Sequence, residues 1–168
     1  MTTYTLPTAS TTTLGGVKVD GTTITVNNGV ISSASSGSFI SPSLTGTTTV
    51  QHIAEIVTNI TGATGTVVHD FNSASSLFYH TNVASDFTVN FTNVPTTNGR
   101  SYIVTLVLIQ GNAAYIPHAV SIDGASQNLF WSTNAQPVGT ANKKEFFSFT
   151  LIRQTNSWII TASVATFG

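Results

Sequence analysis

The chain has 168 residues, of which only 7% are charged, and its formal net charge is −1. This length suffices for one domain with a buried core, but ordinary soluble domains carry about 25% charged residues. The five Lys and Arg residues are scattered, which excludes a basic surface for nucleic acid. Cysteine is absent, so we expect neither disulfides nor thiolate chemistry. No apolar run is long enough to cross a bilayer, and the N-terminus does not resemble a signal peptide.

Residues 1–45 are rich in Thr, Ser and Gly and predict a low-complexity, extended N-terminal arm. Brief strands are expected at 17–19, 23–26 and 30–32, with a turn at Asn27-Asn28-Gly29. The arm holds too few large apolar side chains to bury a core by itself. We expect it to dock on a neighbouring protein or to intertwine with sister chains; a disordered tail is the alternative.

Residues 46–168 predict an antiparallel β-sandwich, jelly-roll-like in its arrangement, because short Thr-, Val-, Ile- and Phe-rich runs are separated by Gly or Asn. In several runs apolar and polar residues alternate, so one face of each strand is buried. The sequence therefore predicts an all-β protein. Strands are expected at 48–60, 66–70, 76–80, 86–92, 101–110, 117–122, 128–132, 145–153 and 157–164.

Three of these strands carry clear apolar rows, and Phe146 begins the opposite face of one of them. The rows are Phe87, Val89 and Phe91; Phe147, Phe149 and Leu151; and Trp158, Ile160, Ala162 and Val164.

The strand from Tyr102 to Ile109 differs, because it is apolar on both faces near its end. Such a strand lies between two sheets or between a sheet and a second subunit. Low charge also leaves the surface prone to self-association. We therefore expect a homo-oligomer, with Tyr102, Val104, Leu106 and Leu108 at the interface between subunits.

Residues for catalysis are not found. Hydrolysis of sugars needs two facing carboxylates, and no two acidic residues are paired by their spacing. Most precede turns or strand starts, where a carboxylate caps the local backbone. Neither a GxSxG elbow nor a phosphate-binding glycine loop is present, so we expect no enzymatic activity. The acidic residues are Asp20, Glu55, Asp70, Asp86, Asp123 and Glu145.

His69 and His80 lie at the ends of neighbouring predicted strands, so a hairpin could bring them together. Near a three-fold axis such imidazoles could hold Zn or Ni. We favour the alternative, in which the histidines donate hydrogen bonds to backbone carbonyls. The sequence predicts no metal and no cofactor.

Aromatic side chains offer the one candidate ligand site, because they stack on sugar rings. Tyr115, Phe130 and Trp131 are the residues expected there. Phe130 and Trp131 are adjacent in a strand and must point to opposite faces. One of them is therefore outward, in a subunit contact, a ligand site or beneath a loop.

The opening segment from Leu6 to Val19, LPTASTTTLGGVKV, resembles a segment that recurs in phage tail-fibre and appendage proteins. The remainder resembles a β-rich C-terminal domain of cyanophage structural proteins. That resemblance rests on FYHT (78–81), NFTNVPTT (90–97), YIPHAVSIDGASQNLFW (115–131), FFSFTLIR (146–153) with Trp158, and the terminal Phe167-Gly168.

The resemblance implies a virion structural protein, assembled in the host bacterial cytoplasm, that forms a homotrimeric short fibre, knob or decoration and has no catalytic residues. Its expected partners are copies of itself, other virion proteins through the arm, and host-surface glycan, but neither nucleic acid nor a membrane. The alternative function is a carbohydrate-binding module that recognises the host receptor.

Overall fold

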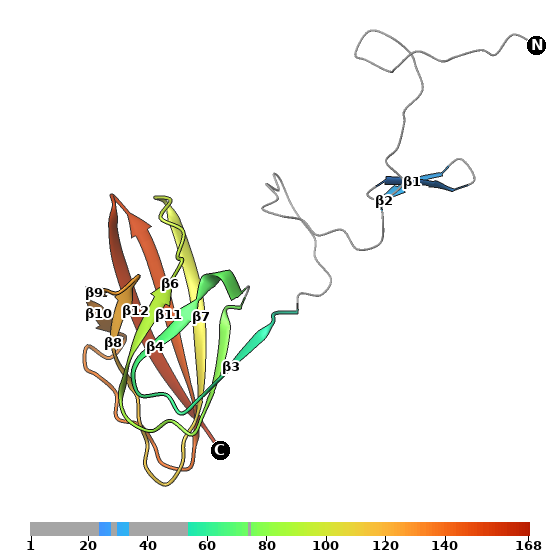
Figure 1. The fold of residues 1–168 in the computed structure, drawn as a ribbon. Helices are drawn as coiled ribbons and strands as arrows, with labels where there is room; N and C mark the ends of the chain where they lie inside the picture. Colours follow the sequence, from blue (N-terminus) through green and yellow to red (C-terminus); the bar gives the residue numbers. More distant parts are fainter. Residues whose placement is uncertain (1–23, 28–29, 34–53, 74) are drawn as a thin grey trace, which may run out of the picture. The chain divides into compact units, whose positions relative to one another are not determined.

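The computed structural model describes residues 24–27, 30–33, 54–73 and 75–168 (Figure 1). The chain divides into two compact units, Met1–Val50 and Gln51–Gly168.

The described part of the first unit is a β-hairpin. In it β1 (Ile24–Asn27) pairs antiparallel with β2 (Val30–Ser33). This confirms the strands predicted at 23–26 and 30–32. The strand predicted at 17–19 and the turn residues Asn28 and Gly29 lie outside the described residues.

The described residues of the second unit form two β-sheets, apart from loops and one 3-10 turn, η1 (Phe71–Ser73). No helix among the described residues is long and apolar enough to span a membrane. The six-stranded sheet has the order β10-β12-β11-β7-β5-β3, and the four-stranded sheet has the order β4-β6-β8-β9. Their bounds are β3 (Val57–Thr61), β4 (Gly65–Asp70), β5 (Leu77–Thr81), β6 (Phe87–Thr92), β7 (Arg100–Ile109), β8 (Pro117–Ile122), β9 (Ala125–Gln127), β10 (Leu129–Trp131), β11 (Lys144–Gln154) and β12 (Ser157–Phe167).

From β3 to β8 the chain winds as a coil between the two sheets. Successive strands alternate, with β3, β5 and β7 in the larger sheet and β4, β6 and β8 in the smaller one. Strands of the same sheet are therefore parallel. Parallel neighbours need a long crossover connection, and here the crossover is itself a strand of the opposite sheet.

The corners of this coil repeat a three-residue pattern. A strand ends at Thr, the next residue has positive φ, and a small apolar residue follows. The middle residues are Gly62, Asn82 and Asn93, with φ of 68°, 53° and 58°. Gly and Asn are the residues that adopt this conformation at least cost. After them Ala63 and Val94 are buried, which anchors each corner to the core.

Two corners stack directly on each other at the ends of β3 and β5. The amide of Gly62 donates to the carbonyl of Thr81, and that of Ala84 donates to the carbonyl of Ala63, both at 2.9 Å. These bonds pair backbone amides and carbonyls at the corners that would otherwise have no partner.

A long hairpin completes the larger sheet. β11 and β12 are antiparallel, and β11 also pairs antiparallel with β7 from Arg100 to Ile109. The hairpin turn places Thr155 and Asn156 at φ of 47° and 60°, as a type I′ turn requires. At its outer edge β12 pairs parallel with the three residues of β10.

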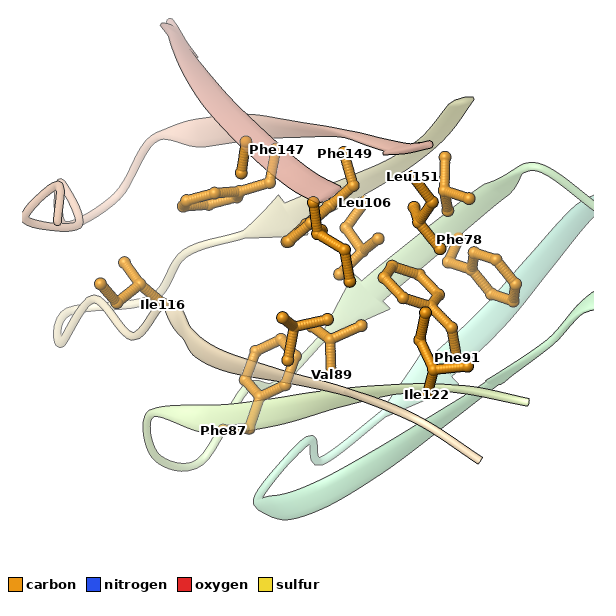
Figure 2. Packing of buried hydrophobic residues seen from close by; sticks show 14 of the residues in the cluster. Phe78, Phe87, Val89, Phe91, Leu106, Ile116, Ile122, Phe147, Phe149 and Leu151 are labelled. Carbon is orange, nitrogen blue, oxygen red and sulfur yellow. The ribbon is translucent and has the colours of Figure 1, made fainter. Parts of the chain in front are cut away.

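The core lies between the two sheets. Phe147, Phe149 and Leu151 project from β11 toward Phe87 and other residues of the smaller sheet (Figure 2). All four are fully buried. The apolar rows predicted for β6 and β11 are therefore confirmed as core, and so is the outward position of Phe146. The predicted row on β12 also points to the core, with Ile160 fully buried.

The all-β prediction with two sheets is confirmed, but the antiparallel pairing is wrong between β3 and β8, where the strands are parallel. Alternating apolar residues predict which face is buried, and they do not distinguish the direction of a neighbour. The parallel coil departs from the antiparallel order of a jelly roll. Of the strand predicted at 48–60, residues 54–56 are not in a strand, and β9 was not predicted.

Truncation of Phe149 should destabilise the sandwich strongly, because this side chain is 0% exposed and packs edge-on against Phe91 at 5.5 Å. Phe149→Ala should lower the free energy of unfolding in urea by about 3–5 kcal/mol. Val138→Ala, at a residue that is 89% exposed, should change it by about 0.5 kcal/mol or less. Equal effects would contradict the assigned core.

Candidate functional site

The most unusual surface is the outer face of the six-stranded sheet, here named the neutral face. It is formed by the side chains of β3, β5, β7, β10, β11 and β12 that point away from the core. Large apolar residues are exposed along it by 36–65%. Along each strand they alternate with more buried residues, and some of them lie opposite one another on neighbouring strands. These residues are Val57, Ile103, Phe130, Phe146, Ile152, Ile159 and Phe167.

Strand register arranges the neutral face in three bands. Across its middle runs a hydroxyl belt, in which Ser148 lies opposite both Ser163 and Thr105, and Thr150 lies opposite Thr161. On one side of the belt is an aromatic band with Phe146 beside Phe167, whose ring centroids are 5.1 Å apart, next to Val107 and Ala165. On the other side is an aliphatic band of Ile103, Ile152 and Ile159. Phe130, on β10, lies opposite Thr161 at the end of the belt.

Charge is almost missing from the neutral face. Among the outward positions of its strands, the only charged residue is Lys144, at the end of β11. Lys144 is exposed there. The centre of the face therefore offers neither attraction nor repulsion to a charged partner.

The opposite side of the sandwich is different in character. Outward positions of β4, β6, β8 and β9 form a row of Val68, Asn90, Ser121 and Ser126. The side-chain oxygen of Asn90 accepts hydrogen bonds from Ser121 and from the amide of Gly124. Val68 is the one large apolar side chain that is exposed on the described strands of this sheet.

The structure corrects the expected interface on β7. Val104, Leu106 and Leu108 are at most 1% exposed and lie in the core of their own chain. Tyr102 is half-buried, and its hydroxyl donates to the carbonyl of Pro95 at 3.2 Å. The pleat therefore turns these four residues inward, and Ile103, at 65% exposure, faces outward instead.

The predicted ligand residues do not form one platform. Phe130 is 54% exposed on the neutral face, whereas Trp131 is half-buried and packs edge-on against Phe147. They point to opposite faces, as predicted. Tyr115 is half-buried beside a shallow hollow that it shares with Asn82 and Asn112. Its backbone is held by Gln110, which bonds both its carbonyl and its amide.

His69 and His80 form a buried hydrogen-bonded pair between the two sheets. Their Nε2 atoms are 3.0 Å apart. Nδ1 of His69 lies 3.0 Å from the carbonyl of Val67, to which only a protonated nitrogen can donate. Neutral His69 is then the acceptor at Nε2 and His80 the donor, which leaves Nδ1 of His80 buried without a partner. The expected donation to a carbonyl is confirmed for His69.

The surroundings of this pair keep both imidazoles neutral. His80 stacks on Phe87 at 5.5 Å, and His69 contacts Phe78 edge-on at 4.8 Å. Burial, and then the neighbouring His80, lower the pKa of His69 to about 3, while burial lowers the pKa of His80 to about 4. No group of three or more metal-ligating side chains occurs among the described residues.

Glu145 is a second buried polar centre, at 1% exposure. One of its carboxylate oxygens accepts from the side-chain amide of Gln110 at 2.7 Å, and the other from the backbone amide of Thr140 at 2.8 Å. The carboxylate thereby ties two loops to the end of β11.

Three of the remaining acids of the described region, Asp70, Asp86 and Asp123, also hold backbone, as predicted. Asp86 accepts from the amide of Ile116, and Asp123 accepts from that of Asn93. Asp70 accepts from Asn93 and Asn72, and these bonds hold the pKa of its carboxyl below the usual range. Glu55 accepts from the hydroxyl of Ser76. Each carboxylate has its own structural partner, and the sequence did not predict the pairing of Glu145 with Gln110.

Acid should destabilise the protein through the histidine pair. Both pKa values are lower in the folded chain than the usual 6.5. Stability is therefore fully present above pH 6.5 and is lost as the pH falls toward 4, since the unfolded chain binds protons first. At pH 5 the loss should be roughly 2 kcal/mol per histidine.

The variant His80→Gln tests whether the histidine pair causes this loss of stability in acid, because the glutamine amide can still donate to His69 but does not titrate. Urea unfolding at pH 7 and pH 5 should show about half of the wild-type loss. His118→Gln, at an exposed position, should keep the full loss. An unchanged loss in His80→Gln would place the acid sensitivity elsewhere.

Replacing the carboxylate of Glu145 should also be costly. Both of its partners are donors, so an amide at this position leaves one N–H facing another. We expect Glu145→Gln to lower the free energy of unfolding by about 1–3 kcal/mol. Glu55→Gln, at an exposed carboxylate, is the matched control and should be nearly neutral. Similar thermal shifts for both variants would argue against a buried acceptor role.

No protein-family model matches the chain, and neither a curated protein nor a solved structure matches it. The likeness to phage appendage proteins that the sequence motifs indicate therefore stays a prediction. A virion role rests on that likeness, whereas self-assembly is supported by the composition of the chain and by the geometry of its described residues.

Proposed function

We propose that this chain is a structural protein of a bacteriophage particle that assembles with copies of itself, as a trimer, into a short fibre, knob or surface decoration. The sandwich forms the projecting part of the assembly. The N-terminal arm, residues 1–45, joins it to other virion proteins, and host-surface glycan is a further contact. The chain carries no catalysis in this proposal.

The observation that carries the proposal is the neutral face. A monomeric soluble protein rarely exposes an apolar patch larger than a few hundred Å². Here seven large side chains are exposed by 36–65% on one sheet face. With charge at 7% of residues, little net repulsion prevents these faces from meeting. Self-association removes this surface from water, as obligate assemblies do.

The polar groups of the interior support a structural role. The buried carboxylate of Glu145 binds backbone and amide donors, and the histidine pair is closed within the core. Asp70, Asp86, Asp123 and Glu145 each accept from a backbone amide of a loop, turn or strand end. A general acid or base needs a group that reaches a substrate, and these groups are committed to the fold instead.

The mass in solution tests the proposal. Size-exclusion chromatography with light scattering of the full chain at micromolar concentration should give about three times the chain mass of 17.6 kDa. Raising the salt concentration should leave the oligomer intact, since apolar contacts rather than ion pairs would hold it. A stable monomer would overturn self-assembly and with it the proposed function.

A further inference from the structure

We infer that the neutral face is the surface on which identical copies of this chain meet, with the hydroxyl belt of one copy against that of the next. This inference rests on the proposed function and specifies its interface. The occupants are the other two copies of the proposed trimer, whose neutral faces turn toward the same three-fold axis.

The size of the face suits such a contact. Its three long strands have ten or eleven residues each. At about 3.3 Å per residue and about 4.8 Å between strands, they alone span roughly 15 by 35 Å. Together with β3, β5 and β10 the face approaches the ~800 Å² that each partner buries in a standard interface.

Chemistry favours an identical copy over another partner. The hydroxyl belt contains Thr105, Ser148, Thr150, Thr161 and Ser163, and each hydroxyl can both donate and accept. A belt can therefore satisfy an identical belt, and apolar bands then meet apolar bands on either side. The lone cation, Lys144, lies at the end of its strand, where its ammonium group can stay in water at the rim.

Association through sheet edges is the competing geometry, and the edges are short. The outer strands of the larger sheet are β10, with three residues, and β3, with five. Those of the smaller sheet are β4, with six, and β9, with three. Short edge strands are a common protection against edge pairing. The broad face therefore remains the surface with the most area to bury.

A pair of matched lysine substitutions tests the interface. Ile103→Lys places a charge in the aliphatic band, at a side chain that is 65% exposed. Val68→Lys places the same charge on the opposite sheet, at 53% exposure. Ile103→Lys should raise the protein concentration needed for assembly by about 100-fold or more, because the ammonium group would lose its water when the faces meet. Val68→Lys should assemble like the wild type.

Cross-linking provides a second measurement that does not depend on a disruptive substitution. Because the chain has no cysteine, Ser163→Cys introduces its only thiol, within the hydroxyl belt. Oxidation of the assembled protein should then give covalent dimers on a non-reducing gel. Ser126→Cys, exposed on β9, should stay monomeric on the same gel.

The outcomes separate the two proposals. A wild-type oligomer that Ile103→Lys leaves intact, or that cross-links through Ser126→Cys and not through Ser163→Cys, overturns the neutral face as the interface and keeps self-assembly. A monomeric wild-type chain overturns both. If Ile103→Lys loses its β-sheet circular dichroism, the Ser163→Cys and Ser126→Cys pair decides the question.

Discussion

Burial of apolar side chains between two sheets is the constraint on which the rest of this protein depends. Each strand has two faces, and its inward residues must meet those of the opposite sheet. The coil from β3 to β8 satisfies this demand turn by turn, because each turn contributes one strand to each layer. The long β11–β12 hairpin adds two strands to the larger sheet, which therefore has more strands than the smaller one. Buried polar side chains of the described residues are bonded to one another or to backbone, as His69 is to His80 and Glu145 to Gln110, although Nδ1 of His80 has no partner.

The two outer faces of the sandwich show how differently the same fold can meet its surroundings. The four-stranded sheet has one large apolar residue exposed on its described strands, Val68, and its outward row also contains the buried, mutually bonded pair Asn90 and Ser121. The six-stranded sheet presents bands of aromatic and aliphatic residues around a line of hydroxyls. A chain with few charges has little else to keep such a surface in water. The two outer faces of the sandwich therefore differ, because one is suited to solvent and the other to contact with another protein surface.

Sequence patterns predicted the existence and inward rows of most strands, because alternation in Phe87, Val89 and Phe91 or in Phe147, Phe149 and Leu151 directly reflects burial. They placed Val104, Leu106 and Leu108 at an interface, because an apolar run on both faces does not reveal which set turns inward. The patterns also did not predict that neighbouring strands are parallel, although the sequence contains a signal for it. The repeated Thr-Gly-Ala and Thr-Asn-Val triplets at 61–63, 81–83 and 92–94 mark the corners of a coil. The pairing of Glu145 with Gln110 depends on residues far apart in the chain, which no local pattern connects.

The winding of β3 to β8 has a consequence for how this architecture can vary. Each circuit of the chain rests on the one before it through stacked corners, such as those at Gly62 and Asn82. A duplicated circuit could form the same strand pairing and the same corner hydrogen bonds with the circuit before it, as repeats do in solenoid proteins. The height of the body can therefore grow by whole circuits while its two layers stay in register. Gain or loss of one circuit would therefore give a taller or shorter version of the same two-layered body.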